Sequence, residues 1–294
     1  MDLADNIINK IDLDAELKSP VNALICFSKP QTGNALGILI NEILAAKPDK
    51  SSITAVHLID EVQAQHIGDI EVYKNELFSQ IIAECEHNHI TIRTFIKTSD
   101  DFVDDILHIA EEQDCNLLLL GIGSNVFNKN LWKKYMMLKS NPVNSEDYIN
   151  EQFEVKEARS LKNVSSLLQR NQNVTAVFID NGFNGSRKVF IPILDKEDTY
   201  IFPYVYQLSL KPEVSIMIWD AIGILQNSSI QKMYQYIVKK SDGRVALWNN
   251  NKKIEYEFIR NQDLMIIGIQ GWDKLISSAL PWTTTLPSTL IIKK

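Results

Sequence analysis

Short apolar runs alternate along the chain with segments whose apolar residues recur at helical spacing. In the first such segment Leu36, Leu39, Ile40, Ile43 and Leu44 share one face of a helix. Short runs that are apolar throughout are typical of parallel strands buried on both faces. The pattern predicts strands at 21–27, 53–59, 90–96, 116–123 and 173–180, with helices between them. We expect Ser99 or Asp100 to cap the helix that begins near Phe102.

The same order of elements begins again after residue 187. It predicts strands at 188–194, 214–219, 245–248, 263–269 and 288–292, with Pro203 starting or kinking the helix between the first two. Turn residues at 181–186 mark the boundary. Strands that alternate with helices indicate an α/β protein with two tandem doubly wound parallel sheets. The expected organisation is a linker or short docking helix at 1–20, a first domain at 21–183 with a helical insertion at about 127–170, and a shorter second domain at 187–294.

Two of the predicted strands end in glycines. The run at 116–123 ends with Gly121 and Gly123, and the run that starts at Asp263 leads to Gly268 and Gly271. Both begin with a polar residue, which suggests an internal duplication. In open α/β sheets ligands bind outside the carboxyl ends of the strands, where these glycines lie.

The residues after Gly123 allow two interpretations. Ser124 or Asn125 could cap a helix that carries Lys129, Lys133 and Lys134, and this arrangement could hold an anion. The alternative is an ordinary helix cap with a solvated basic face.

Five parallel strands, the fourth ending in glycines, resemble the universal stress protein fold, which is also the fold of adenine nucleotide alpha hydrolase-like domains. Residues 177–183 and 188–193 further resemble the join between the stress-protein repeats in the cytosolic C-terminal region of bacterial monovalent cation:proton (Na⁺/H⁺) antiporters. The resemblance covers about residues 21–294.

Nucleotide-binding members of the stress-protein family carry a Gly, two residues, a second Gly, nine residues, and then Gly-Ser or Gly-Thr. Gly121 and Gly123 are separated by only one residue, and Lys133-Lys134 stands at the distal position. Gly268 and Gly271 have the family spacing, but Pro281-Trp282 follows. Asp195 matches the acidic residue that follows the family's first strand, whereas Ser28 stands near that place in the first copy.

These departures predict degenerate nucleotide pockets, with ATP or another adenine nucleotide as the candidate cofactor that the resemblance suggests. The resemblance implies a non-catalytic regulatory or sensor region whose partner is the membrane antiporter portion of the same or a neighbouring polypeptide. The alternative is a free-standing tandem universal stress protein that binds ATP. A third possibility is a dimerisation platform, because family members commonly associate through their closing strands, here 174–179 and 288–292.

Composition narrows the picture further. The net charge of -7 argues against a nucleic-acid partner. The start of the chain lacks the features of a signal peptide, so we expect a cytoplasmic location, with a possible tether to the inner membrane through an upstream transporter domain. We expect a homodimer and no enzymatic activity, since no nucleophile–base pair is apparent.

The remaining candidate residues favour packing over chemistry. Cys26, Cys85 and Cys115 are scattered along the chain, so we expect them to be buried free thiols. His87 and His89 are expected in a surface turn, and no metal site is predicted. Trp219, Trp248, Trp272 and Trp282 all fall in the second copy, where they either pack in the core or form a protein–protein surface.

Overall fold

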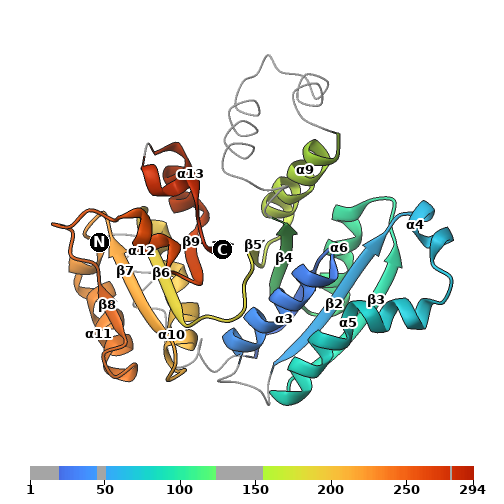
Figure 1. Ribbon diagram of the computed structural model, residues 1–294, viewed down its shortest axis with the longest axis horizontal. Helices are drawn as coiled ribbons and strands as arrows, with labels where there is room; N and C mark the ends of the chain where they lie inside the picture. The colour runs from blue at the N-terminus through green and yellow to red at the C-terminus, as the bar shows by residue number, and fades with distance from the viewer. Residues whose placement is uncertain (1–19, 45–50, 124–154, 279) are drawn as a thin grey trace.

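The computed structural model describes residues 20–44, 51–123, 155–278 and 280–294. Their strands form one 10-stranded sheet in the order β3-β2-β1-β4-β5-β10-β9-β6-β7-β8. Neighbouring strands are parallel except β5 and β10, which are antiparallel. From each outer edge to the middle, the order is third, second, first, fourth and fifth strand. Figure 1 shows the first half in blue to green on the right and the second half in yellow to red on the left.

The first half follows the predicted alternation of strands and helices. Its described elements are β1 (Asn22–Cys26), α3 (Pro30–Leu44), β2 (Ser52–Ile59), α4 (Glu61–His66), α5 (Ile70–His87), β3 (Thr91–Thr98), α6 (Phe102–Glu112), β4 (Leu117–Gly123), α9 (Val155–Arg170) and β5 (Val174–Asp180). The short helix α4 was not predicted. The predicted cap of α6 was wrong: the carboxylate of Asp101 accepts hydrogen bonds from Val103 N and Asp104 N, both at 3.0 Å. The linker and most of the predicted insertion lie outside the described residues.

The second half is shorter and its helices are briefer. Its elements are β6 (Lys188–Ile193), the 3₁₀ helix η2 (Lys196–Ile201), α10 (Phe202–Ser209), β7 (Ser215–Asp220), η3 (Ile224–Gln226), α11 (Ser228–Lys240), β8 (Val245–Leu247), α12 (Tyr256–Arg260), β9 (Leu264–Gly268), α13 (Ile269–Ser277), η4 (Pro281–Thr284) and β10 (Ser288–Lys293). Pro203 lies in the first turn of α10, where proline needs no helical hydrogen-bond partner. Helix α13 begins at Ile269, directly after β9, so Gly271 lies inside it.

Helices cover both faces of the sheet. Buried residues of α3, α5, α10 and α11 belong to one apolar cluster, and those of α6, α9, α12 and α13 belong to the other. Successive strand residues alternate between the two clusters, as Leu24 and Ile25 do, because side chains of a strand point to opposite faces. Each cluster runs through both halves. This is the doubly wound α/β fold that the sequence predicts.

The two halves meet where β5 pairs with β10. Phe178 lies opposite Leu290, and Val177 lies opposite Ile291. These are the closing strands that would offer their edges to a second copy if the chain were a dimerisation platform, the third possibility given above. Strands β5 and β10 pair with each other within one chain, so β3 and β8 are the outer strands of the described sheet. None of the helices in the described residues has both the length and the apolar character needed to cross a membrane.

Candidate functional site

The carboxyl ends of β6 and β9 form the switch point of the second half. These strands are neighbours, while β6 pairs on its other side with β7 and β9 pairs with β10. Chain connections therefore leave in opposite directions, which creates the place where open α/β sheets bind ligands. Asp195 follows β6, Gly268 ends β9, and Gly271 lies in the first turn of α13. The structure brings these three predicted residues together.

A fourth residue, Asp198, occupies the centre of this place. Its side chain is fully buried. Asp198 Oδ2 accepts hydrogen bonds from Leu194 N at 3.0 Å and Asp195 N at 2.9 Å, and Oδ1 accepts one from Gly271 N at 3.0 Å. The carboxylate thus joins the end of β6 to the start of α13.

The two glycines make room for that carboxylate. A Cβ atom at Gly268 would lie 3.0 Å from Asp198 Cγ, and a Cβ atom at Gly271 would lie 2.9 Å from it. Both distances are shorter than van der Waals contact, so a side chain at either position would displace the carboxylate. The glycine spacing that suggested a nucleotide pocket has a structural use in this chain.

Tyr200 completes the filling of this site. Its hydroxyl accepts a hydrogen bond from Ile269 N at 3.1 Å and donates one to Ile292 O in the neighbouring strand. Burial raises the pKa of this phenol, which keeps it protonated and able to donate. The backbone of α13 is therefore satisfied from within the chain at Ile269 and Gly271.

Asp195 lies at the rim, with a different environment. It accepts a hydrogen bond from Glu197 N at 3.0 Å and forms an ion pair with Lys274 Nζ at 2.7 Å. The Glu197 amide and the Lys274 ammonium lower the pKa of its carboxyl group. Burial raises the pKa of Asp198, and its three backbone hydrogen bonds oppose that shift. The pKa values of the two carboxyl groups shift in opposite directions because Asp198 is fully buried, whereas Asp195 is only partly buried and pairs with Lys274.

The sequence pattern did not single out Asp198 or Tyr200 as residues of this site. Asp195 and Asp198 form a reciprocal capping box around the start of η2. The sequence signal that could have pointed to Asp198 is its position, three residues after Asp195 at the end of a predicted strand. That signal predicts a local cap, whereas the contact with Gly271 depends on the fold.

The glycine exit of the first half also serves close packing. A Cβ atom at Gly121 would lie 2.6 Å from both Thr32 Cγ2 and Leu36 Cδ1 of α3. Helix α3 therefore rests directly on the end of β4, where only a glycine fits. Gly123 is the last residue of β4, and Ser124 and Asn125 lie outside the described residues, so their anion-binding arrangement stays a prediction.

The polar residues that open the two glycine-ending strands have matching roles at the opposite end. Asn116 Oδ1 accepts a hydrogen bond from Asn22 N at 3.1 Å, and Asp263 Oδ2 accepts one from Lys188 N at 2.7 Å. In each case the backbone N–H of the polar residue donates to the carbonyl of that same partner, at 2.9 Å. The repeated feature of the sequence is therefore a repeated structural connection between the first and fourth strand of each half.

The histidines and cysteines lie in separate local environments. Both ring nitrogens of buried His57 are engaged, one with Phe27 O and one with Tyr73 Oη, each at 3.0 Å, and burial lowers its pKa. His87 and His89 are exposed beside the end of α5. The described residues contain no group of three or more His, Cys, Asp and Glu side chains that could hold a metal ion. Burial raises the pKa of all three thiols, which keeps them unreactive: Cys26, Cys85 and Cys115.

Trp219, Trp248 and Trp282 of the second half pack against aromatic neighbours, and Trp272 belongs to one of the two apolar clusters. Trp272 and Trp282 are buried, whereas Trp219 and Trp248 are half-buried. Ring centroids lie 6.1 Å apart in the Trp219–Trp282 pair and 4.5 Å apart in the Trp248–Phe258 pair. These contacts favour core packing as their role.

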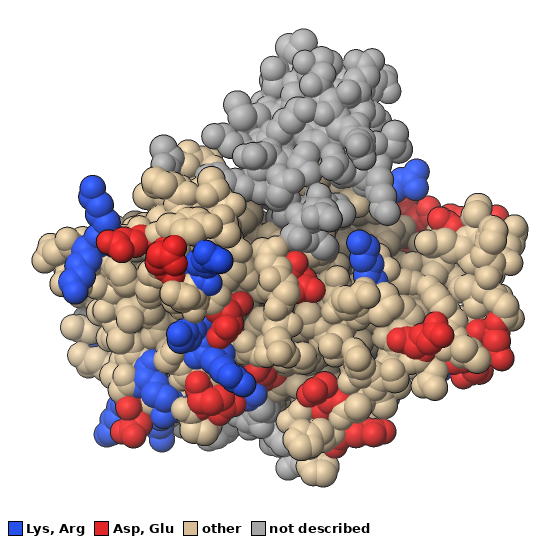
Figure 2. All heavy atoms as spheres, in the orientation of Figure 1, with Lys and Arg blue, Asp and Glu red and all other residues tan. Residues whose placement is uncertain are grey.

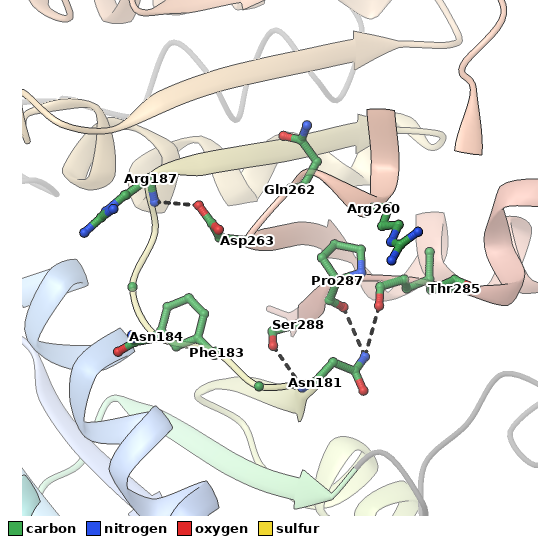
Figure 3. A pocket seen from close by; sticks show the side chains of 13 residues that line it. Asn181, Phe183, Asn184, Arg187, Arg260, Gln262, Asp263, Thr285, Pro287 and Ser288 are labelled. Atoms are coloured by element: carbon green, nitrogen blue, oxygen red, sulfur yellow. Dashed lines mark hydrogen bonds between the residues drawn. The ribbon is translucent and has the colours of Figure 1, made fainter. Parts of the chain in front are cut away.

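A polar cavity of about 370 Å³ lies at the join between the halves (Figure 3). Asn181 donates from its backbone to Ser288 Oγ at 2.9 Å, and Asp263 accepts from Arg187 N at 3.1 Å. Beside the cavity, the Glu42 carboxylate accepts a hydrogen bond from Ser186 N at 3.2 Å. The linker between the halves, residues 181–187, is thereby tied to both of them. The cavity is lined by Asn181, Gly182, Phe183, Asn184, Gly185, Arg187, Arg260, Gln262, Asp263, Thr285, Leu286, Pro287 and Ser288.

No protein-family model and no curated protein matches the chain. Among solved structures, a candidate universal stress protein from Pseudomonas aeruginosa UCBPP-PA14 has a TM-score of 0.46 at 10% identity, with 94% of each chain covered. A functionally unknown protein from Pseudomonas aeruginosa PAO1 has a TM-score of 0.43 at 10% identity, with 92% of each chain covered. A universal stress protein from Archaeoglobus fulgidus DSM 4304 has a TM-score of 0.42 at 12% identity, covering 92% of this chain and 97% of that one. The assignment of the α/β fold above rests on strand order and helix placement alone.

Proposed function

We propose that this chain is a non-catalytic regulatory or sensor module with two universal stress protein-like units, acting on the cytoplasmic side of a bacterial cation:proton antiporter. The observation that carries the non-catalytic part is the buried carboxylate of Asp198. It accepts the hydrogen bond of the Gly271 amide and fills the space beside Gly268 and Gly271. A nucleotide phosphate would have to displace a charged group held by three backbone hydrogen bonds.

The antiporter part of the proposal rests on the join between the two halves. Residues 177–183 and 188–193 resemble the join of stress-protein repeats in antiporter tails. The intervening linker is held by side chains of both halves, since Glu42 binds Ser186 N and Asp263 binds Arg187 N. A firmly held join suits a module that acts as one body on a partner.

Such a module would regulate by preferring one state of its partner. A regulatory domain shifts a conformational equilibrium only through different affinities for the two states. On the described part of the face in Figure 2, basic side chains are interspersed with acidic ones. A partner that docks there would meet both signs of charge, which differs from the continuous basic surface typical of nucleic-acid binding.

Nucleotide titration tests the pocket. Isothermal titration of the whole chain with ATP and magnesium should give no binding heat up to millimolar concentrations. A dissociation constant in the micromolar range would contradict the degenerate pocket and support the alternative of a free-standing, ATP-binding stress protein.

The coding region tests the partner. The same or a neighbouring reading frame should encode the membrane-spanning helices of an antiporter. Antiport is then measured in inverted membrane vesicles that contain the antiporter either with this chain or without it. The ion concentration that gives half-maximal dissipation of the pH gradient should differ between the two. An unchanged concentration, or reading frames without membrane helices, would contradict the antiporter role and leave the fold untouched.

A further inference from the structure

Helix α4 buries none of its side chains. Its start is stabilised locally by a reciprocal capping box, in which Asp60 Oδ1 accepts from Gln63 N at 2.7 Å and Gln63 Oε1 accepts from Asp60 N at 3.2 Å. The helix nevertheless carries Val62 with an exposed fraction of 63%, and the start of α5 carries Ile70 and Val72 with exposed fractions of 48% and 55%. The described residues thus leave three large apolar side chains of neighbouring helices largely uncovered. Apolar side chains that gather in this way mark interaction surfaces.

An open groove of about 470 Å³ lies between α4 and α5. Val72 lines it together with Ile67 and Tyr73. Val62 and Ile70 extend this apolar surface, because each lies one helical turn before a residue that lines the groove. The apolar surface is therefore longer than the groove itself, which suits a peptide helix better than a small molecule.

The aromatic wall of the groove is fixed from the interior. Tyr73 Oη lies 3.0 Å from His57 Nε2, and His57 Nδ1 lies 3.0 Å from Phe27 O. Burial lowers the pKa of His57, so its ring is neutral, and Nδ1 must donate because a carbonyl oxygen can only accept. Nε2 therefore accepts from the Tyr73 hydroxyl. A tyrosine that is already held in one orientation loses little conformational entropy when a partner packs on it.

The surroundings of the groove are acidic. Residues 60–76 contain one lysine and five carboxylates, all five of them exposed: Asp60, Glu61, Asp69, Glu71 and Glu76. Within the described part of the chain, none of the five forms an ion pair. In Figure 2 the part of the face over α5, at the right of the view, carries mostly acidic side chains. The complementary surface is therefore apolar in its centre and basic around it.

We infer that the groove between α4 and α5 is the docking surface for a basic amphipathic helix of a partner protein. The apolar side of that helix packs on Ile67, Val72 and Tyr73, and its lysine or arginine side chains pair with the surrounding carboxylates. The inference deepens the proposed function and rests on it only for the identity of the partner, because cytoplasmic segments of membrane proteins are rich in Lys and Arg. The same carboxylates repel an anionic membrane surface.

The test titrates the full natural chain with a synthetic peptide of about 14 residues, four helical turns, in which leucines and lysines form opposite faces of a helix. Fluorescence anisotropy of the labelled peptide measures binding, and the amide resonances of Gly68 and Val72 in ¹H–¹⁵N correlation spectra report the site. A peptide of the same composition without helical periodicity is the ligand control. The periodic peptide should bind about tenfold more tightly than this control.

Variants at exposed residues separate the apolar contact from the charge. Val72→Ser should weaken binding about five- to tenfold, because it removes an apolar side chain from the groove. Leu247→Ser is its matched control, since Leu247 has an exposed fraction of 44% on β8, at the opposite edge of the sheet. Glu76→Lys should weaken binding about threefold at low salt, whereas Glu111→Lys, at an exposed carboxylate of α6 outside the groove, should leave it unchanged.

Each outcome decides the inference. Tighter binding of the periodic peptide, resonance shifts confined to the groove, and losses in Val72→Ser and Glu76→Lys alone support it. Equal binding of the two peptides, equal losses in the control variants, shifts elsewhere on the chain, or no binding up to millimolar peptide would overturn it. Shifts at the groove when the chain is diluted without peptide, or when vesicles of phosphatidylserine and phosphatidylcholine are added, would overturn it as well. The occupant would then be a second copy of the chain or a membrane.

Failure of this inference and failure of the proposed function are distinguishable. Peptide binding at the groove by a chain that leaves antiport unchanged would support the docking surface and contradict the antiporter as its partner. An effect on antiport that persists in Val72→Ser and Glu76→Lys would support the proposed function and contradict the role of the groove.

Discussion

At the scale of single residues, glycines and carboxylates define the switch point of the second half. Gly271 lies inside α13, where an alanine would raise helix propensity by about 1 kcal/mol. The same change would force a methyl group against the buried carboxylate of Asp198. Overpacking costs about 1–3 kcal/mol, and a displaced buried charge adds to that cost. The steric effect is therefore expected to prevail over helix propensity.

Gly271→Ala should lower the free energy of unfolding by about 1–3 kcal/mol. Gly68→Ala is the matched control, because no atom lies within 4 Å of its added Cβ. That variant should stay within about 1 kcal/mol of the natural chain. Urea unfolding followed by circular dichroism measures both. Equal stability of the two variants would contradict the role given to Gly271.

Asp195 makes stability depend on pH. Its pKa in the folded chain is below its ordinary value of 3.8, so the unfolded chain binds a proton more readily. The stabilisation from its bonds to Glu197 N and Lys274 is therefore present above about pH 4 and is lost as the pH falls through the folded pKa. Asp195→Asn should melt at a lower temperature than the natural chain at pH 7, and the gap should narrow at pH 3. A gap that widens on acidification would show that the sign is wrong.

At the scale of elements, side chains pin the first and fourth strands of each half to one another. Asn116 and Asp263 act at corresponding places, and Asp263 also accepts from Arg187 N in the linker. This explains why a polar residue precedes both apolar runs.

Asp263→Ala should lower the free energy of unfolding by about 1–3 kcal/mol, since two backbone donors lose their acceptor. Asp100→Ala, at an exposed carboxylate, should change it by no more than about 0.5 kcal/mol. Chemical denaturation of both variants provides the comparison. Loss of equal size in both would argue that net charge, and not the hydrogen bonds, is responsible.

At the scale of the whole molecule, the antiparallel pairing of β5 with β10 makes one sheet of two halves. Residues of both halves share each apolar cluster, and α3 packs against α10 across the join. The closing strands therefore occupy the centre of the sheet, while β3 and β8 lie at its edges. A homodimer of this chain would have to use another surface than these closing strands.

Hydrogen exchange should reveal this arrangement. Amides of β5 and β10 should exchange as slowly as those of β1 and β6, because all of them are paired on both sides in the sheet. Amides of the edge strand β3 should exchange faster. Mass spectrometry of peptides from residues 174–180, 288–293 and 91–98 gives the comparison. Fast exchange at β10 would indicate that the two halves separate in solution.

The sequence by itself determined the succession of strands and helices, because each depends on local periodicity. Apolar runs such as 117–120 and 264–267 are too short and too continuous for amphipathic helices, and Leu36, Leu39 and Ile43 can share a face only in a helix. It also placed Gly268 and Gly271 at the carboxyl end of a strand, and the family resemblance placed Asp195 directly after the first strand of the second half. The predicted cap of α6 was one or two residues too early because Ser99, Asp100 and Asp101 all have suitable side chains.

Only the tertiary structure decided what these residues do. The pairing of β5 with β10 joins strands far apart in the chain, and apolar runs carry no record of their partners. Asp198 fills the switch point through contacts with residues of β9 and α13, while its local pattern predicts no more than a helix cap. Composition and spacing can show that a ligand motif is present. Whether the site is open or already occupied depends on which side chain the fold places there.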